Sequence, residues 1–402
     1  MYNLLSGISV VEVSSFVASP TAGLYMAQFG ADVIRVDQIG GGQDFHRWPV
    51  NDRNDSLSWE NLNRAKRSLA LDFKRPEARE LLAELIGKTG NLITNLPANG
   101  FLAHDTLAKK RADLITVRIM GWPDGSVALD YTANAAVGYA ALTGPVEDPR
   151  PVNHVLPAWD LLTGAYAAFA LLASIRRRDT TGEGGEVRLP LSDIAMGSAA
   201  NLGRVAEVLY QGHDRERLGN AVIGTIGRDF VTRDGVRLMI VAINERQWQG
   251  LVKALDLNEA LGRVEAERGV SFTNDEGIRF RNRDAIFVAV EGAVGRLDHA
   301  AVAALLDSNG VVHGPYQTMM QAVNDPRLVT ENPLFAVSQG NPSGLDYPAA
   351  GAFATLPALE RKPASPAPRL GEHSEAILAD CMGLSSGEIA RLIDAGIAGV
   401  SK

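Results

Sequence analysis

Short apolar strands alternate regularly with helical segments over residues 8–200, and this alternation sets the fold class of the chain. β-branched, apolar runs predict strands at 8–13, 31–37, 67–73, 91–96, 113–121 and 185–192. Helical periodicity predicts helices between them at 18–30, 76–90, 133–142, 160–176 and 194–209. An alternation of this kind predicts an α/β fold, in which a largely parallel sheet is covered by helices on both faces.

The pattern changes near residue 219. Residues 228–243 predict a β-hairpin around Asp234-Gly235, a dipeptide that favours tight turns. Helical segments are expected at 244–264 and 276–307, which indicates a smaller α+β region. A Pro- and Gly-rich stretch that includes 363–368 then predicts an extended linker.

Charge and cysteine content exclude several classes of protein. The chain has 39 Lys and Arg against 47 Asp and Glu, a net charge of −8, so neither nucleic acid nor an anionic membrane is the expected partner. The single cysteine, Cys381, excludes a disulfide framework, and the 7 histidines lack metal-binding spacing, so no metal is expected. The N-terminus resembles no signal peptide, and the longest apolar run, 161–175, is interrupted by Thr163 and Gly164. We therefore expect a soluble, cytoplasmic protein.

A nicotinamide-dependent dehydrogenase is disfavoured by the turn after the first strand. A dinucleotide site requires G-x-G-x-x-G at this turn, where residues 14–20 contain no glycine. The run Gly40–Gly42 follows the second strand instead. A G-x-S-x-G elbow and a Walker A motif are also missing from the sequence, which leaves a carboxylate as the candidate for covalent chemistry.

Asp160 is the most suggestive carboxylate, because it stands alone in an apolar segment at the start of a hydrophobic helix. One interpretation is an N-cap, a position that aspartate favours. The other is a nucleophile that the free helix amides keep ionised, so that it can attack a carbonyl at neutral pH. Small residues in the following turns, Gly164 and Ala168 among them, would let a substrate approach.

The segment 61–74 is the second candidate, because it concentrates basic residues. It is either a solvated loop that leads into a strand or a binding site for ligand phosphates. In the second interpretation the phosphate ligands are Arg64, Lys66, Arg67 and Lys74.

Several blocks of sequence, in the same order, resemble the class III CoA-transferases, the family of formyl-CoA, carnitine and bile-acid CoA-transferases and of α-methylacyl-CoA racemases. The blocks lie at 6–23, 29–37, 63–74, 93–100, 141–144, 158–173, 182–193 and 369–378. The resemblance implies a Rossmann-like large domain built from both chain ends, with a smaller inserted α+β domain. The boundaries that follow are 1–214 for the large CoA-binding domain, 215–325 for the small domain, and 326–402 for the linker and the return. The family also implies an interlocked homodimer.

The resemblance makes Asp160 the catalytic nucleophile, since it matches the aspartate before the family's G-x-x-x-A-x-x-x-L helix. It assigns CoA binding to Val17, Ala18, Leu71, Asp72, Lys74, Asn95, Leu96 and Pro97. The expected partner is an acyl-CoA, and CoA enters as part of this substrate, so no separate cofactor is expected. Leu129 stands where the racemases carry a histidine, which disfavours racemisation, and Asn99 and Ala103 stand where the family usually has an arginine.

Within the family, residues 39–50, 144–160 and 227–241 resemble the members that move CoA between the C1 and C4 carboxylates of 2-methylfumaryl-CoA (mesaconyl-CoA). Such intramolecular transfer would proceed through an aspartyl-CoA thioester. His154 and Arg47 are candidates to hold the free carboxylate, and each also has a structural interpretation. The alternatives are intermolecular CoA transfer to a different acid, a racemase, and a non-catalytic acyl-CoA-binding module.

Overall fold

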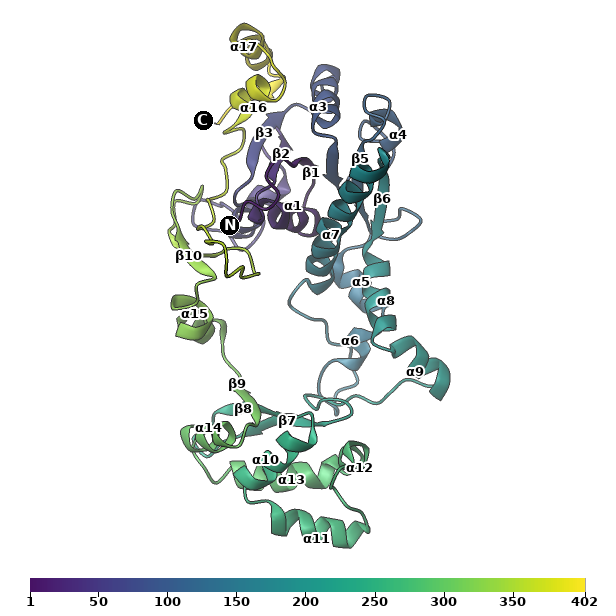
Figure 1. Ribbon diagram of the computed structural model, residues 1–402, viewed down its shortest axis with the longest axis vertical. Coiled ribbons are helices and arrows are strands. Elements are labelled where there is room, and N and C mark those ends of the chain that lie inside the picture. The colour runs from purple at the N-terminus through teal and green to yellow at the C-terminus, as the bar shows by residue number, and fades with distance from the viewer. Residues whose placement is uncertain (402) are drawn as a thin grey trace. The chain divides into compact units, whose positions relative to one another are not determined.

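The computed structural model describes residues 1–401, which divide into two compact units (Figure 1). The large unit comprises Met1–Gly138, Asn153–Gly212 and Asp325–Lys402, and the small unit comprises Tyr139–Val152 and His213–Asn324. The large unit thus draws on both ends of the chain. The segment Tyr139–Val152 belongs to the small unit, whereas the expected boundaries assign it to the large domain.

A seven-stranded sheet forms the centre of the large unit, in the order β12-β3-β2-β1-β4-β5-β6. Its strands are β1 (Ser9–Val13), β2 (Asp32–Gln38), β3 (Arg67–Leu71), β4 (Asn91–Thr94), β5 (Ile115–Met120), β6 (Gly185–Pro190) and β12 (Ala398–Gly399). All neighbours pair in parallel except β12, the C-terminal edge strand, which runs antiparallel to β3. The predicted α/β fold with a largely parallel sheet is confirmed.

Alternating side chains of the strands explain why helices cover both faces of the sheet. In β1, Val10 belongs to the core cluster that includes residues of α1 and α7, whereas Val11 and Val13 belong to the cluster that includes residues of α3, α16 and α17. These helices are α1 (Ala18–Gln28), α3 (Pro76–Thr89), α7 (Ala158–Thr181), α16 (Ser374–Asp380) and α17 (Ser386–Asp394). Helix α3 begins at Pro76 and ends before Gly90, which adopts a left-handed conformation. Proline at the start and glycine after the end are the signals that predicted these bounds.

Two expected helices are each divided by a glycine. The helix predicted at 133–142 is α5 (Asp130–Ala136) and α6 (Tyr139–Leu142), and the helix predicted at 194–209 is α8 (Leu191–Asn201) and α9 (Arg204–Gln211). Gly138 and Gly203 lie between the pairs with φ values of 85° and 76°. A residue in this left-handed region interrupts the helical hydrogen bonds, so apolar periodicity alone overestimates helix length.

The small unit packs helices on a three-stranded antiparallel sheet in the order β7-β8-β9. Its strands are β7 (Ile226–Val231), β8 (Arg237–Ala242) and β9 (Val312–Pro315), and its helices after α6 are α10 (Glu245–Ala254), α11 (Asn258–Arg268), α12 (Glu276–Arg281), α13 (Arg283–Val294), α14 (His299–Ser308) and α15 (Met319–Asn324). The hairpin predicted around Asp234-Gly235 is confirmed. The large unit also contains η1 (Gln43–His46), α2 (Leu57–Leu62), α4 (His104–Leu107), η2 (Pro326–Thr330), β10 (Phe335–Ser338) and β11 (Tyr347–Ala350).

Helices α1 and α7 lie in close contact, and a glycine makes this contact possible. A Cβ atom on Gly164 would lie 2.6 Å from the Cβ of Thr21 and 2.7 Å from the carbonyl oxygen of Ala18. Gly164 therefore serves helix packing, a role that the sequence interpretation did not assign to it.

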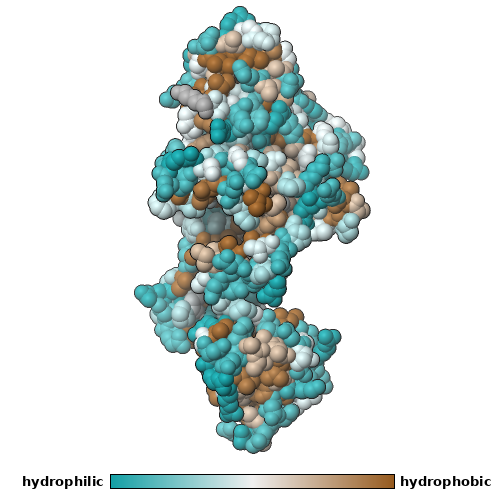
Figure 2. Space-filling model, turned by 90° about the vertical axis from the view of Figure 1, so that its left-hand side faces the viewer, coloured by the Kyte–Doolittle hydropathy of each residue, from teal (hydrophilic) through white to brown (hydrophobic). Residues whose placement is uncertain are grey.

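Helix α7 is also long and apolar enough to span a membrane, with a mean hydropathy of 1.4, but the core helix of a globular unit meets the same test. On the face shown in Figure 2, apolar side chains form patches separated by polar ones.

The substitution Gly164→Ala is expected to lower the free energy of unfolding by about 1–3 kcal/mol, because the added methyl group forces α1 and α7 apart. The matched control is Gly87→Ala in α3, where the new Cβ makes an ordinary contact of 3.6 Å with Lys110. This control is expected to be neutral or to stabilise by up to about 1 kcal/mol. Urea denaturation of both variants checks the prediction, and equal effects would contradict it.

Candidate active site

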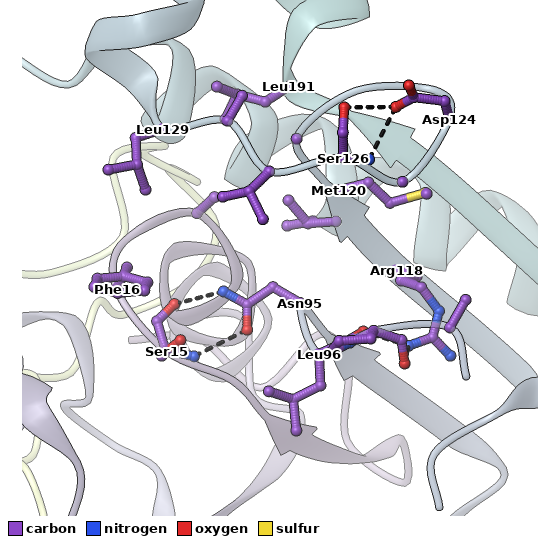
Figure 3. Close-up of a pocket in the computed structure, with 18 of the residues that line it drawn as sticks. Ser15, Phe16, Asn95, Leu96, Arg118, Met120, Asp124, Ser126, Leu129 and Leu191 are labelled. Atoms are coloured by element: carbon purple, nitrogen blue, oxygen red, sulfur yellow. Dashed lines mark hydrogen bonds between the residues drawn. The ribbon is translucent and has the colours of Figure 1, made fainter. Parts of the chain in front are cut away.

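A cavity of about 480 Å³ opens at the carboxyl edge of the sheet, between the ends of β1 and β4 (Figure 3). The strand order reverses here, since β2 and β3 lie on one side of β1 while β4, β5 and β6 lie on the other. Crevices at this reversal are the usual ligand sites of open α/β sheets. The lining includes Ser15, Phe16 and Ala18 after β1, Asn95–Asn99 after β4, Leu129 before α5, and Asp160 in α7.

Asn95 joins the two loops that flank the cavity. Its Oδ1 accepts a hydrogen bond from the amide of Ser15 at 3.1 Å, and its Nδ2 donates to the carbonyl of Ser15 at 2.9 Å (Figure 3). Arg118 of β5 holds the loop that follows β4. Its guanidinium donates to the carbonyls of Leu96, Pro97 and Leu102 in this loop and to the carboxylate of Glu186. These bonds leave Arg118 engaged with the protein itself.

Phe16 lies in an unusual turn at the same cavity. Its φ of 68° is in the left-handed region, which a residue with a bulky side chain adopts only when its surroundings impose it. Its amide donates to Asp44 Oδ2 at 2.7 Å, and Asp44 lies in η1, after β2. Arg47, which follows η1, stacks on the Phe16 ring with its Cζ 4.9 Å from the ring centroid. The turn therefore brings a cation next to the cavity.

Helix α7 begins at Ala158, with Pro157 in the N-cap position, so the expectation that Asp160 caps this helix is wrong. Asp130, the first residue of α5, takes that role, because its Oδ2 accepts from the amides of Trp159 and Asp160 at 2.7 and 3.0 Å. His154 Nε2 donates to the other oxygen of Asp130 at 2.7 Å. Two amides that could stabilise a charge on Asp160 are thus directed at Asp130.

This arrangement raises the pKa of Asp160 to about 7. Burial is the larger cause, the negative charge of Asp130 is the second, and the positive charge of Arg47 opposes both. The expectation was that free helix amides keep Asp160 ionised, but the amides of Trp159 and Asp160 are bonded to Asp130 instead. The raised pKa makes the Asp160 carboxylate more basic than that of an ordinary aspartate.

Arg64 and Lys66, predicted to bind phosphates, are buried and have partners inside the large unit. Arg64 donates to the carbonyl of Ala350 at 2.9 Å, and Lys66 forms an ion pair with Glu12 at 2.8 Å. Lys66 also donates to the carbonyl of Pro20. The structure does not support phosphate binding by these two side chains, because burial and internal pairing leave them unavailable to a ligand.

The remaining predicted CoA contacts lie along the same edge of the sheet. Ala18, Asn95, Leu96 and Pro97 line the cavity with Asp160, and Val17 directly precedes Ala18 at the start of α1. Three further residues lie at the end of β3, two strands from β1, and none of them lines the cavity: Leu71, Asp72 and Lys74. Leu71 belongs to the core, Asp72 accepts from Gln38, and Lys74 is exposed.

Four contributors to this site went unnoticed in the sequence: Phe16, Asp44, Arg118 and the capping function of Asp130. Only Arg118 carries a sequence signal, since a charged residue inside an apolar strand needs buried partners. The others act through tertiary contacts between distant segments. Within residues 1–401, the acidic, histidine and cysteine side chains form no group suited to hold a metal ion.

Comparison with known proteins identifies the family. A model of CoA-transferase family III matches residues 5–374. The chain is 44% identical to the 2-methylfumaryl-CoA isomerase of Chloroflexus aurantiacus, over 99% of this chain and 98% of the relative. It is 26% identical to the succinate–glutarate CoA-transferase of Agrobacterium fabrum, over 94% and 95% of the two chains.

A solved structure of similar fold is that of a CaiB/BaiF family protein from Brucella suis. Its TM-score is 0.78 at 24% sequence identity, and the match covers 95% of this chain and 100% of the other. This likeness concerns the fold, whereas the full-length sequence matches concern the family. The resemblance inferred from the sequence blocks is therefore confirmed, and the chain belongs to CoA-transferase family III.

Proposed function

We propose that this protein is an intramolecular CoA transferase that moves CoA between the C1 and C4 carboxylates of 2-methylfumaryl-CoA, with Asp160 as nucleophile. The observation that carries the proposal is the position of Asp160 at the cavity, beside Ala18 and Asn95–Pro97. The chain also shares 44% identity with the 2-methylfumaryl-CoA isomerase of Chloroflexus aurantiacus. Asp124, the other carboxylate of the lining, is exposed and bonded to Ser126, so Asp160 is the better nucleophile.

The reaction begins when the Asp160 carboxylate attacks the thioester carbonyl. The C–S bond breaks, CoA leaves as a thiolate, and a mixed anhydride of Asp160 and the acid forms. The thiolate then attacks the Asp160 carbonyl, so that CoA is held as an aspartyl thioester and the C1 carboxylate is released. The C4 carboxylate attacks this thioester, which expels the CoA thiolate and forms a new mixed anhydride with Asp160. The thiolate then attacks the C4 carbonyl, which makes the C4 thioester and regenerates the Asp160 carboxylate.

The environment of Asp160 suits this chemistry. Burial and the neighbouring charge of Asp130 destabilise the free Asp160 carboxylate, which is why its pKa is raised to about 7. Acylation removes that charge, so the enzyme-bound anhydride and thioester escape both penalties. A more basic carboxylate is also a better nucleophile than an ordinary aspartate.

An isotope experiment separates this function from intermolecular transfer, the activity named for the Agrobacterium relative. 2-Methylfumaryl-CoA labelled at C1 is incubated with the enzyme and an excess of unlabelled 2-methylfumarate. Intramolecular transfer predicts that the label stays in the CoA ester while the ester position moves from C1 to C4. Loss of label to the free acid at the rate of isomerisation would contradict the proposal and identify an intermolecular transferase.

We also propose that the chain acts as a homodimer. The face formed by α7, α8 and α9 exposes a series of large apolar side chains, and α9 buries no residue of its own. They are Leu162, Tyr166, Phe169, Met196, Val208, Leu209 and Tyr210. Exposed apolar side chains gathered on adjoining helices favour burial against a partner. Sedimentation at micromolar concentration should therefore give twice the 43.0 kDa of one chain.

The proposed reaction transfers an acyl group without net oxidation, so it requires no cofactor besides the CoA of the substrate. We propose a cytoplasmic location, without a nucleic-acid or membrane partner, from the net charge of −8 and the single cysteine.

A further inference from the structure

Arg47 is a cation near the nucleophile that forms no close ion pair in the described chain. The Arg47 side chain is exposed, and within residues 1–401 its guanidinium forms neither an ion pair nor a side-chain hydrogen bond. It rests on the ring of Phe16, which lines the cavity, and its charge acts on Asp160. An arginine held on an aromatic face keeps its five N–H donors in one plane, available to a carboxylate.

Arg118 is the cation that lines the cavity itself, and its donors are already occupied. Arg118 is almost fully buried, and its donors are directed at Glu186 and at three backbone carbonyls. His154 donates to Asp130 and, unlike Arg47, has an acidic partner at hydrogen-bond distance. The buried Arg64 and Lys66 are paired elsewhere. By this comparison Arg47 is the basic group that remains available for an anion near Asp160.

A dicarboxylic substrate requires such a group. While one carboxylate of the diacid reacts at Asp160, the other stays ionised next to the negative Asp130 and, in the free enzyme, Asp160. Without a cation, this second carboxylate would be repelled from the partly buried site. Acylation removes the charge of Asp160, and the remaining acidic neighbour of Arg47 is Asp44. Asp44 Oδ2 already accepts a hydrogen bond from the amide of Phe16, so Arg47 stays available to the substrate carboxylate.

We infer that Arg47 is a specificity-determining residue, which binds the free carboxylate of a dicarboxylyl-CoA and selects dicarboxylic over neutral acyl groups. This inference rests on the proposed function for the identity of the acid, but it concerns any acyl-CoA with a second carboxylate. The Phe16 ring packs against the guanidinium, and the hydrogen bond from the Phe16 amide to Asp44 fixes the turn that carries the ring. In the intramolecular reaction, Arg47 also retains the released diacid between the two transfers.

The test compares two CoA esters, 2-methylfumaryl-CoA and its analogue in which the free carboxylate is a carboxamide. Binding is measured by calorimetry, and acylation of Asp160 by hydroxylamine trapping and mass spectrometry. Arg47→Met is expected to weaken binding of the acid by about 100-fold, the range of a charge-assisted hydrogen-bonded pair, and to leave the carboxamide within about 3-fold. Arg47→Lys should restore part of the lost affinity, since lysine keeps the positive charge but cannot form the paired hydrogen bonds that a planar guanidinium makes to a carboxylate.

Arg391→Met is the matched control, because Arg391 is an exposed arginine of α17 without an ion pair in the described chain. It should leave both ligands unaffected. The inference is overturned if Arg47→Met weakens both esters equally, or neither. The outcome is independent of the isomerase assignment, because preference of the wild-type protein for the acid over the carboxamide can be measured even if CoA does not move from C1 to C4.

Discussion

Replacing Asp160 by asparagine is expected to lower kcat by about 10⁴-fold or more, because an amide cannot form the mixed anhydride on which both transfers depend. The affinity for the acyl-CoA should change little, since the loops after β1 and β4 that line the cavity are held by the Asn95–Ser15 and Arg118 contacts. Turnover is measured by chromatographic separation of the C1 and C4 esters, and affinity by calorimetry.

Asp124→Asn is the control for this substitution. Asp124 lines the same cavity, but its carboxylate is exposed and is bonded to Ser126 in its own loop (Figure 3). Its kcat should stay within about 3-fold of the wild type, as expected for a surface substitution. Hydroxylamine added during turnover should convert Asp160, and not Asp124, to a hydroxamate. Full activity of Asp160→Asn would refute the covalent mechanism.

Replacing Asp130 is expected to produce the second large effect, and its form depends on the substituent. In Asp130→Asn the amide oxygen still accepts from Trp159 and Asp160, but the charge is lost. The pKa of Asp160 should then fall from about 7 toward its ordinary range, without reaching it, because burial remains the larger cause. Since Asp160 must be ionised to attack, the acid limb of the kcat profile should move to lower pH by about one unit.

Asp130→Ala removes the hydrogen bonds as well as the charge. Two amides in the first turn of α7 lose their acceptor, which should lower the free energy of unfolding by about 1–3 kcal/mol. Misplacement of Asp160 should also reduce kcat by about 100-fold. A pH profile of Asp130→Asn that coincides with the wild type would show that the charge of Asp130 does not act on Asp160, whatever the alanine variant does.

Most of the fold could be predicted from the sequence, because apolar periodicity is a local property. The strands β1 to β6 and the helices α1, α3 and α7 occupy the expected segments, within a few residues at their ends. The errors occur where one residue interrupts a pattern, as Gly138 and Gly203 do, or where a segment joins another unit, as Tyr139–Val152 does.

The site was predictable only in part. Asp160, Asn95 and Pro97 were assigned by resemblance, and the structure places them at one cavity. Their assignment as functional residues stays a prediction. Arg64 and Lys66 belong to the same basic segment as Lys74, yet two of these three cations are buried in internal contacts. Nothing in a run of charged residues tells which side chains turn inward, since this depends on Glu12 and Ala350, far away in the chain.

The family and the α/β class could be read from the order of residue types along the chain, and the same order made Asp160 the candidate nucleophile. The basicity of Asp160 follows instead from contacts that exist in the folded chain alone. Asp130 takes the helix amides that Asp160 was expected to use, and Arg47 stands beside the cavity because η1 places it on Phe16. Basicity and charge pairing depend on distances between segments that only the folded chain brings together.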